Sequence, residues 1–185
     1  MNRRPALVLA FVSCLLAAPA SGHPFHGAGD LAAGLAHPFL GIDHLLAMLA
    51  IGLWASRAGA RAAWAVPGAF VLAMLGGFGL GLAGVAAPGI EPMIAVSVLV
   101  LGLLVASRAM PSAPACLALA GGFAVFHGLA HAIELPAGGS AAGYAAGFVL
   151  ATAALHAAGL VLGRRLNPRI GGLPIALVGA WMLMA

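Results

Sequence analysis

Charged residues are scarce in this chain, and lysine is absent. Only 6% of the 185 residues are charged, whereas 63% are hydrophobic and the mean hydropathy is +1.11. Ordinary soluble domains have about a quarter charged and about half apolar residues, so the composition excludes both a soluble domain and a disordered chain. The eight basic residues are all arginines and form no basic run, which predicts no nucleic-acid partner. A membrane is the remaining environment.

The N-terminus has the three-part layout of a secretory signal peptide. Arg3 and Arg4 precede an apolar run over residues 6–18, which small residues follow. The run is too short for a comfortable span, so we predict that residues 1–22 are a cleaved signal peptide, with an uncleaved anchor as the alternative. One of the two cysteines lies in this segment, so the mature chain, residues 23–185, has no intramolecular disulfide.

The rest of the chain divides into six apolar stretches. A helix needs about 20 apolar residues to cross the bilayer core. The predicted segments cover residues 38–56, 63–85, 91–107, 113–135, 141–163 and 169–184. Pro38 suits the first position of a helix, but it could equally kink a longer helix that begins near Asp30. We therefore predict an all-α membrane protein built as a bundle of six transmembrane helices.

Small residues recur at every fourth position in two of these segments. They lie at residues 73, 77 and 81, and again at residues 143, 147 and 151. Such spacing is typical of helices that pack closely in a membrane.

The arginines give the bundle an orientation. If the N-terminus is exported, the first, third and fifth connections face the cytoplasm and should hold the positive charge. All the arginines after the predicted signal peptide lie in these three connections, and the acids lie toward the opposite side. The sequence therefore predicts a multi-pass protein of the bacterial inner membrane with both mature termini in the periplasm.

Ionisable residues inside a bilayer are costly, and here they gather in two stretches. The residues are His37, Asp43 and His44 in the first predicted span, and His127, His131 and Glu134 in the fourth. The second set has the spacing i, i+4, i+7, which places it on one stripe of a helix. Because the first and fourth spans run in opposite directions, both sets fall in the exported half of the membrane. We predict that they meet there.

Three further residues have more than one interpretation. Glu91, at the outward start of the third span, either joins the cluster or is simply stabilised by a helix N-terminus. His23 would complete an N-terminal chelate after cleavage at Ala20, or a weaker one after cleavage at Gly22, and the alternative is a solvated tail. His156 could mark an exit path, but packing is the favoured interpretation.

Imidazole with carboxylate favours a borderline divalent ion such as nickel, cobalt or zinc, and disfavours copper(I). The residues alone do not distinguish a transported ion from a catalytic one. The main alternative is an intramembrane zinc hydrolase, because the same donors can hold zinc with an open position for water. Haem held by two histidines is a third possibility, which the neighbouring acids disfavour.

Two motifs resemble the HupE/UreJ proteins, a family of nickel permeases. They are His-Pro-x-x-Gly-x-Asp-His-x-x-x-Met at residues 37–48 and Phe-His-Gly-x-Ala-His-x-x-Glu at residues 126–134. The resemblance implies uptake of Ni²⁺, or sometimes Co²⁺, for hydrogenase or urease maturation. It also implies no enzymatic activity and no permanent cofactor. Besides the bilayer, a cytoplasmic nickel chaperone is an expected partner, because binding of the imported ion there could maintain the gradient. It assigns the metal to His37, Asp43, His44, His127, His131 and Glu134, with Glu91 as a further match.

Overall fold

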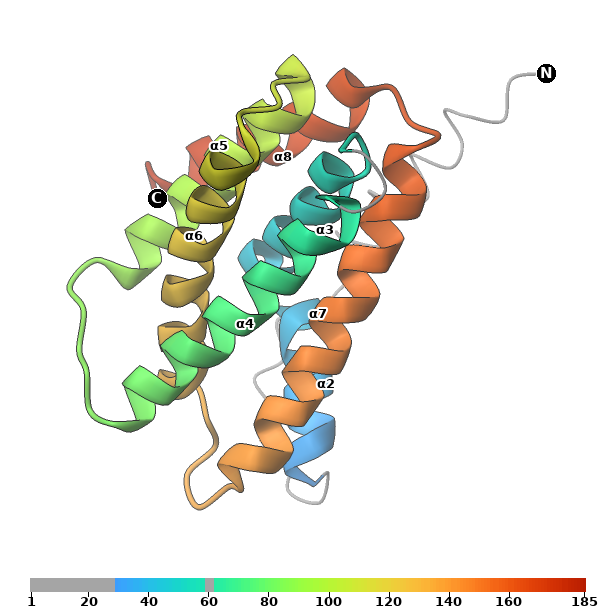
Figure 1. Ribbon diagram of the computed structural model, residues 1–185. Helices are drawn as coiled ribbons and strands as arrows, with labels where there is room; N and C mark the ends of the chain where they lie inside the picture. Colours follow the sequence, from blue (N-terminus) through green and yellow to red (C-terminus); the bar gives the residue numbers. More distant parts are fainter. Residues whose placement is uncertain (1–28, 59–61) are drawn as a thin grey trace.

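The computed structural model describes residues 29–58 and 62–185, and the secondary structure of this part of the chain is entirely helical (Figure 1). The predicted signal peptide and His23 lie outside the described residues. Seven helices follow one another in the described residues: α2 (Asp30–Leu40), α3 (Ile42–Ala55), α4 (Ala62–Leu82), α5 (Ile90–Ser107), α6 (Ala113–Ile133), α7 (Ala141–Gly163) and α8 (Pro168–Met182).

Four of these helices, α4 to α7, are long and apolar enough to cross a membrane. The number rises to five if α2 and α3, which are bent relative to each other, together make one span. Helix α8 has 15 residues, fewer than a membrane crossing needs. The all-α membrane class is therefore confirmed as a multi-pass helical protein, and the full count of six spans stays a prediction.

The structure does not show one straight span over residues 38–56 but favours the alternative, a longer helical segment that begins at Asp30 and is bent. Helix α2 already begins at Asp30, and α3 leaves it at an angle of 78°. Pro38 has no backbone N–H to donate one turn back, and Gly41 adopts an extended conformation with φ −82° and ψ 113°. The N–H of Gly41 still donates to the carbonyl of His37, at 3.1 Å. This hydrogen bond completes the last turn of α2 immediately before α3 begins.

The helices pack in pairs, α4 against α6, α5 against α8, and α2 and α3 against α7 (Figure 1). The predicted small-residue positions lie at these crossings. A Cβ atom added at Gly77 of α4 would overlap the backbone of α6, and one at Gly147 of α7 would overlap the backbone of α2. The close packing that the spacing indicated is therefore confirmed.

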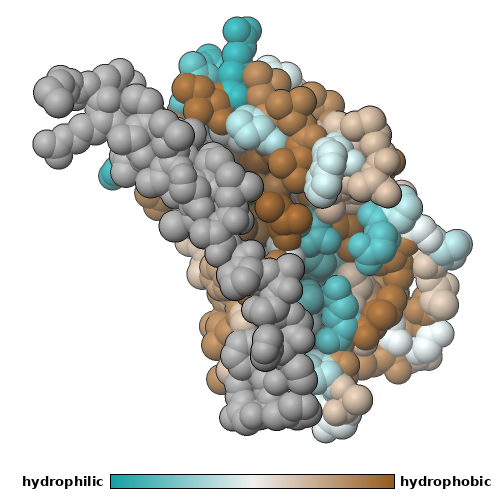
Figure 2. Space-filling model, turned by 180° about the vertical axis from the view of Figure 1, so that it is seen from behind, coloured by the Kyte–Doolittle hydropathy of each residue, from teal (hydrophilic) through white to brown (hydrophobic). Residues whose placement is uncertain are grey.

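The outside of the bundle is largely apolar, as Figure 2 shows for one face. Large hydrophobic side chains such as Trp64, Leu72 and Leu177 are more than half exposed. In water such a surface would be unfavourable, whereas lipid tails solvate it. Polar residues that the lipid would not tolerate are turned inward, and the most concentrated group of them is the candidate site.

Candidate metal centre

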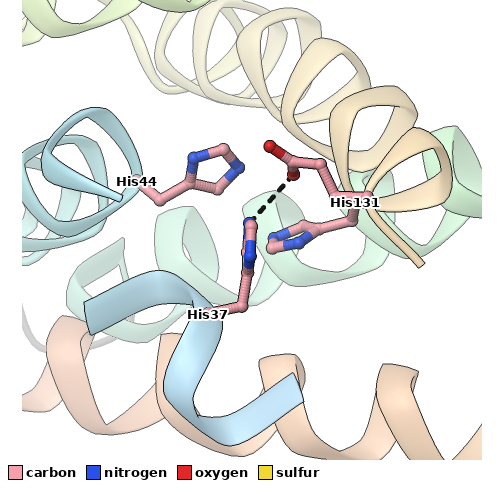
Figure 3. A group of neighbouring side chains, drawn as sticks. His37, His44 and His131 are labelled. Atoms are coloured by element: carbon pink, nitrogen blue, oxygen red, sulfur yellow. Dashed lines mark ion pairs between the residues drawn. The ribbon is translucent and has the colours of Figure 1, made fainter. Parts of the chain in front are cut away.

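The corner between α2 and α3 faces the end of α6, and four side chains converge there. They are His37 from the last turn of α2, His44 from the first turn of α3, His131 from the last turn of α6, and Glu134, which caps that helix. One possible ligand atom from each of the four lies within 4.8 Å of all the others. Figure 3 shows the three imidazoles directed toward one another. We call these four residues the outer cluster.

The outer cluster is open on one side and closed on the other. The side chain of Glu134 is 38% exposed and that of His37 is 22% exposed, whereas His44 and His131 are buried. Nε2 of His37 lies 2.9 Å from Oε2 of Glu134, within ion-pair distance but without the angles of a hydrogen bond (Figure 3). An ion would therefore meet the exposed Glu134 and His37 first.

Three of the four ring nitrogens of His44 and His131 have no hydrogen-bond partner within the described chain. Both ring nitrogens of His131 and Nε2 of His44 are buried without a hydrogen bond. A buried polar atom in this condition costs about 1–3 kcal/mol. Donor atoms around one small divalent ion lie about 3 Å apart, so modest side-chain rotations would bring these nitrogens into a coordination shell. A neutral imidazole has one unprotonated ring nitrogen, and such a nitrogen, buried without a partner, is suited to a metal ion.

Asp43 lies behind His44 and outside the group of four donors. Its Oδ1 is 2.9 Å from Nδ1 of His44 and also accepts the backbone N–H of His44. An ionised carboxylate can only accept, so Nδ1 of His44 carries the proton and Nε2 presents its lone pair to the outer cluster. Carboxylates that orient a ligating histidine in this way also raise its basicity. The geometry favours a positioning role for Asp43 over direct coordination.

His127 lies one step deeper, and its ring centre is 4.8 Å from that of His44. It is completely buried, and its Nε2 is 3.0 Å from Oγ of Ser97 on α5. The hydroxyl of Ser97 already donates to the carbonyl of Ile94, so at His127 it accepts and Nε2 carries the proton. Nδ1 of His127 is left unprotonated and without a partner. The sequence analysis missed Ser97, for which the only signal was a hydroxyl within an apolar span.

Helix α7 closes the site with two aromatic residues that the sequence analysis also missed. Phe148 stacks on His131 with ring centres 4.2 Å apart and an angle of 6° between the planes. The ring of Tyr144 is 6.0 Å from that of His37. These two residues are four positions apart on one buried face of α7, and this spacing was the available signal.

Glu91 is placed apart from the outer cluster. It lies exposed in the first turn of α5, although it is within electrostatic reach of Asp43 and Glu134. Its negative charge therefore adds to the potential at the open side without a position in the group of donors. His23, the remaining predicted ligand, lies outside the described residues.

The comparisons with known proteins cover nearly the whole chain. Residues 9–185 match the family described as HupE / UreJ protein. The chain is also similar to Protein HupE from Rhizobium leguminosarum bv. viciae, with 45% identity over 179 residues, covering 91% of this chain and 93% of that protein. No solved structure matches the chain.

Proposed function

The chain belongs to the HupE/UreJ family, and on that premise we propose that it is an inner-membrane permease for nickel or cobalt that supplies hydrogenase or urease maturation. The observation that carries the proposal is the outer cluster, His37, His44, His131 and Glu134, whose donor atoms lie within 4.8 Å of one another. Three imidazoles and one carboxylate form a donor set that borderline divalent ions favour. The transported ion is the substrate, and no permanent cofactor is part of the proposal.

Charge balance supports a divalent ion. An imidazole that binds a metal ion does so in its neutral form and adds no charge, whereas Glu134 and Asp43 contribute one negative charge each, Glu134 within the outer cluster and Asp43 through His44. Uncompensated charge is costly within a membrane, so two carboxylates match an ion of charge +2. A monovalent ion would leave a surplus of negative charge.

We propose that loading begins at the open side. The ion displaces His37 from its contact with Glu134, exchanges water for these two side chains, and then reaches the buried nitrogens of His44 and His131. Each step replaces a hydration ligand with a protein donor, which keeps the cost of dehydration low. The acidic side chain of Glu91 concentrates cations near this opening.

The test is metal influx into liposomes that contain the purified full-length protein and a trapped metal-sensing dye. Nickel, cobalt and zinc are compared, with and without a proton gradient. We expect saturable nickel or cobalt influx that His131→Ala abolishes. The matched control is Cys116→Ala, which changes another buried side chain of α6 at a distance from the cluster and should leave influx unchanged.

Two results would overturn the proposal. One is influx no faster than in empty liposomes from protein that is correctly inserted. The other is zinc retained in stoichiometric amount together with lipid or peptide cleavage, which would instead support the hydrolase.

A further inference from the structure

A row of buried side chains, three of them with polar groups, extends inward along α7. Tyr144, Phe148, Thr152 and His156 are spaced every four residues and therefore share one face of the helix. All four are at most 2% exposed. The hydroxyls of Tyr144 and Thr152 and both ring nitrogens of His156 have no hydrogen-bond partner in the described part of the chain.

This face connects the outer cluster to the opposite half of the bundle. Tyr144 and Phe148 contact the rings of His37 and His131. From Tyr144 to His156 the helix rises about 18 Å, toward the end of α7 at Gly163. An ion that leaves the outer cluster along this face would therefore move away from its open side.

A series of neighbouring rings that starts at His44 of α3 and His127 of α6 also leads to His156. His44 is followed by His127 at 4.8 Å between ring centres, and His127 by Phe70 of α4 at 5.7 Å. Phe70 in turn lies 5.4 Å from His156, with the planes at 89°. Two independent series of side chains thus lead from the outer cluster to His156.

Packing alone does not account for Thr152 and His156. A buried polar atom without a partner is destabilising, and a valine or leucine of similar size would avoid this cost. The neighbouring Leu155 and Leu160 show that α7 accepts apolar residues at buried positions. A role that needs a hydroxyl and an imidazole without protein partners explains why these two are present.

We propose that Thr152 and His156 form an inner position for the same divalent cation, which receives it from the outer cluster before its release on the other side. This inference rests on the proposed transport function. An imidazole and a hydroxyl, without a carboxylate, bind such an ion more weakly than the outer cluster does. Conduction requires positions from which the ion can leave, so weak neutral donors suit an inner position.

The test uses His156→Leu and Thr152→Val, which keep approximate size and remove the donors. We expect nickel influx to fall about tenfold, as for a barrier higher by about 1.4 kcal/mol. The maximal rate should fall while equilibrium nickel binding and the half-saturating concentration, both set by the outer cluster, stay unchanged. Thermal stability in detergent should stay the same or increase, because the costly unpartnered groups are gone.

Two matched variants separate this role from packing. Thr152→Ser restores the hydroxyl and should restore influx relative to Thr152→Val. Leu155→Ala removes a buried apolar side chain from the same turn of α7, and should lower stability without lowering influx per folded protein.

Each outcome bears on one of the two proposals. If the wild-type protein neither binds nor moves nickel or cobalt, the proposed function fails. If the wild type transports the ion and both His156→Leu and Thr152→Val keep its rate, the inner position fails while the permease stands. A parallel loss of influx, nickel binding and stability would also overturn the inner position, because it would reveal a structural role.

Discussion

Asp43 offers a direct test of how the outer cluster is held, because its carboxylate contacts His44 from behind. We consider two substitutions, Asp43→Ala and Asp43→Asn. The first removes the acceptor for Nδ1 of His44, and the second keeps an oxygen acceptor but removes the charge. If Asp43 positions His44, the two variants should differ, whereas a direct ligand would be lost in both.

The magnitude follows from the burial of His44. Its side chain is 2% exposed, so water has little access to replace the acceptor, which lies 2.9 Å from Nδ1. A buried N–H left without a partner costs about 1–3 kcal/mol, and loss of such an orienting carboxylate weakens metal binding about 10–100-fold. Hydrogen bonds to charged groups are roughly twice as strong as neutral ones, so Asp43→Asn should lose about half of that free energy.

The assay is equilibrium nickel binding to the purified protein, followed by influx into liposomes. We expect His131→Ala to have the largest defect, then Asp43→Ala, then Asp43→Asn. Nickel binding by Asp43→Asn as weak as that of His131→Ala would refute the positioning role and indicate direct coordination. Wild-type binding by Asp43→Ala would show that His44 does not need this contact.

Other predictions concern packing, the deeper histidine and the open side. Gly128→Ala forces a Cβ atom into the backbone of α4 and should lower the free energy of unfolding by about 1–3 kcal/mol. The control is Gly122→Ala on the same helix, where the added Cβ meets open space and should be neutral or slightly stabilising. Thermal stability in detergent measures both. Equal stability of the two variants would contradict the close crossing. Ser97→Ala removes the acceptor for His127 and should cost about 1–2 kcal/mol of stability, while Ser97→Thr should cost less. Glu134→Gln keeps size but loses charge, so nickel affinity should fall about tenfold in the binding assay; unchanged affinity would remove Glu134 from the donors.

The convergence of the two polar stretches could be predicted from the sequence. The arginine distribution indicated the direction of each span, and the direction placed both sets in one half of the membrane. The structure brings His37 and His44 together with His131 and Glu134 in that way. The direction of each span and the helical rise per residue suffice for this prediction, because together they determine the depth of a residue in the membrane.

The roles of individual side chains could not be predicted in the same way. Asp43 precedes His44 in the motif, and spacing does not reveal whether a carboxylate binds the ion or orients its neighbour. Thr152 and His156 look like packing residues because α7 is apolar around them. Their importance depends on which atoms lack partners, and that follows only from the packing of several helices.

The distance between His37 and His44 depends on the corner at Gly41 and could not be predicted from the helical repeat. On one straight helix, His37 and His44 would share a face but lie about 10 Å apart along the axis, too far to bind one ion. The 78° bend between α2 and α3 instead brings their ring centres to 5.2 Å. Pro38 and Gly41, which weaken the helix between the two histidines, therefore help to bring these two members of the outer cluster together. Substitutions that straighten this corner should separate the two imidazoles while leaving every donor atom present.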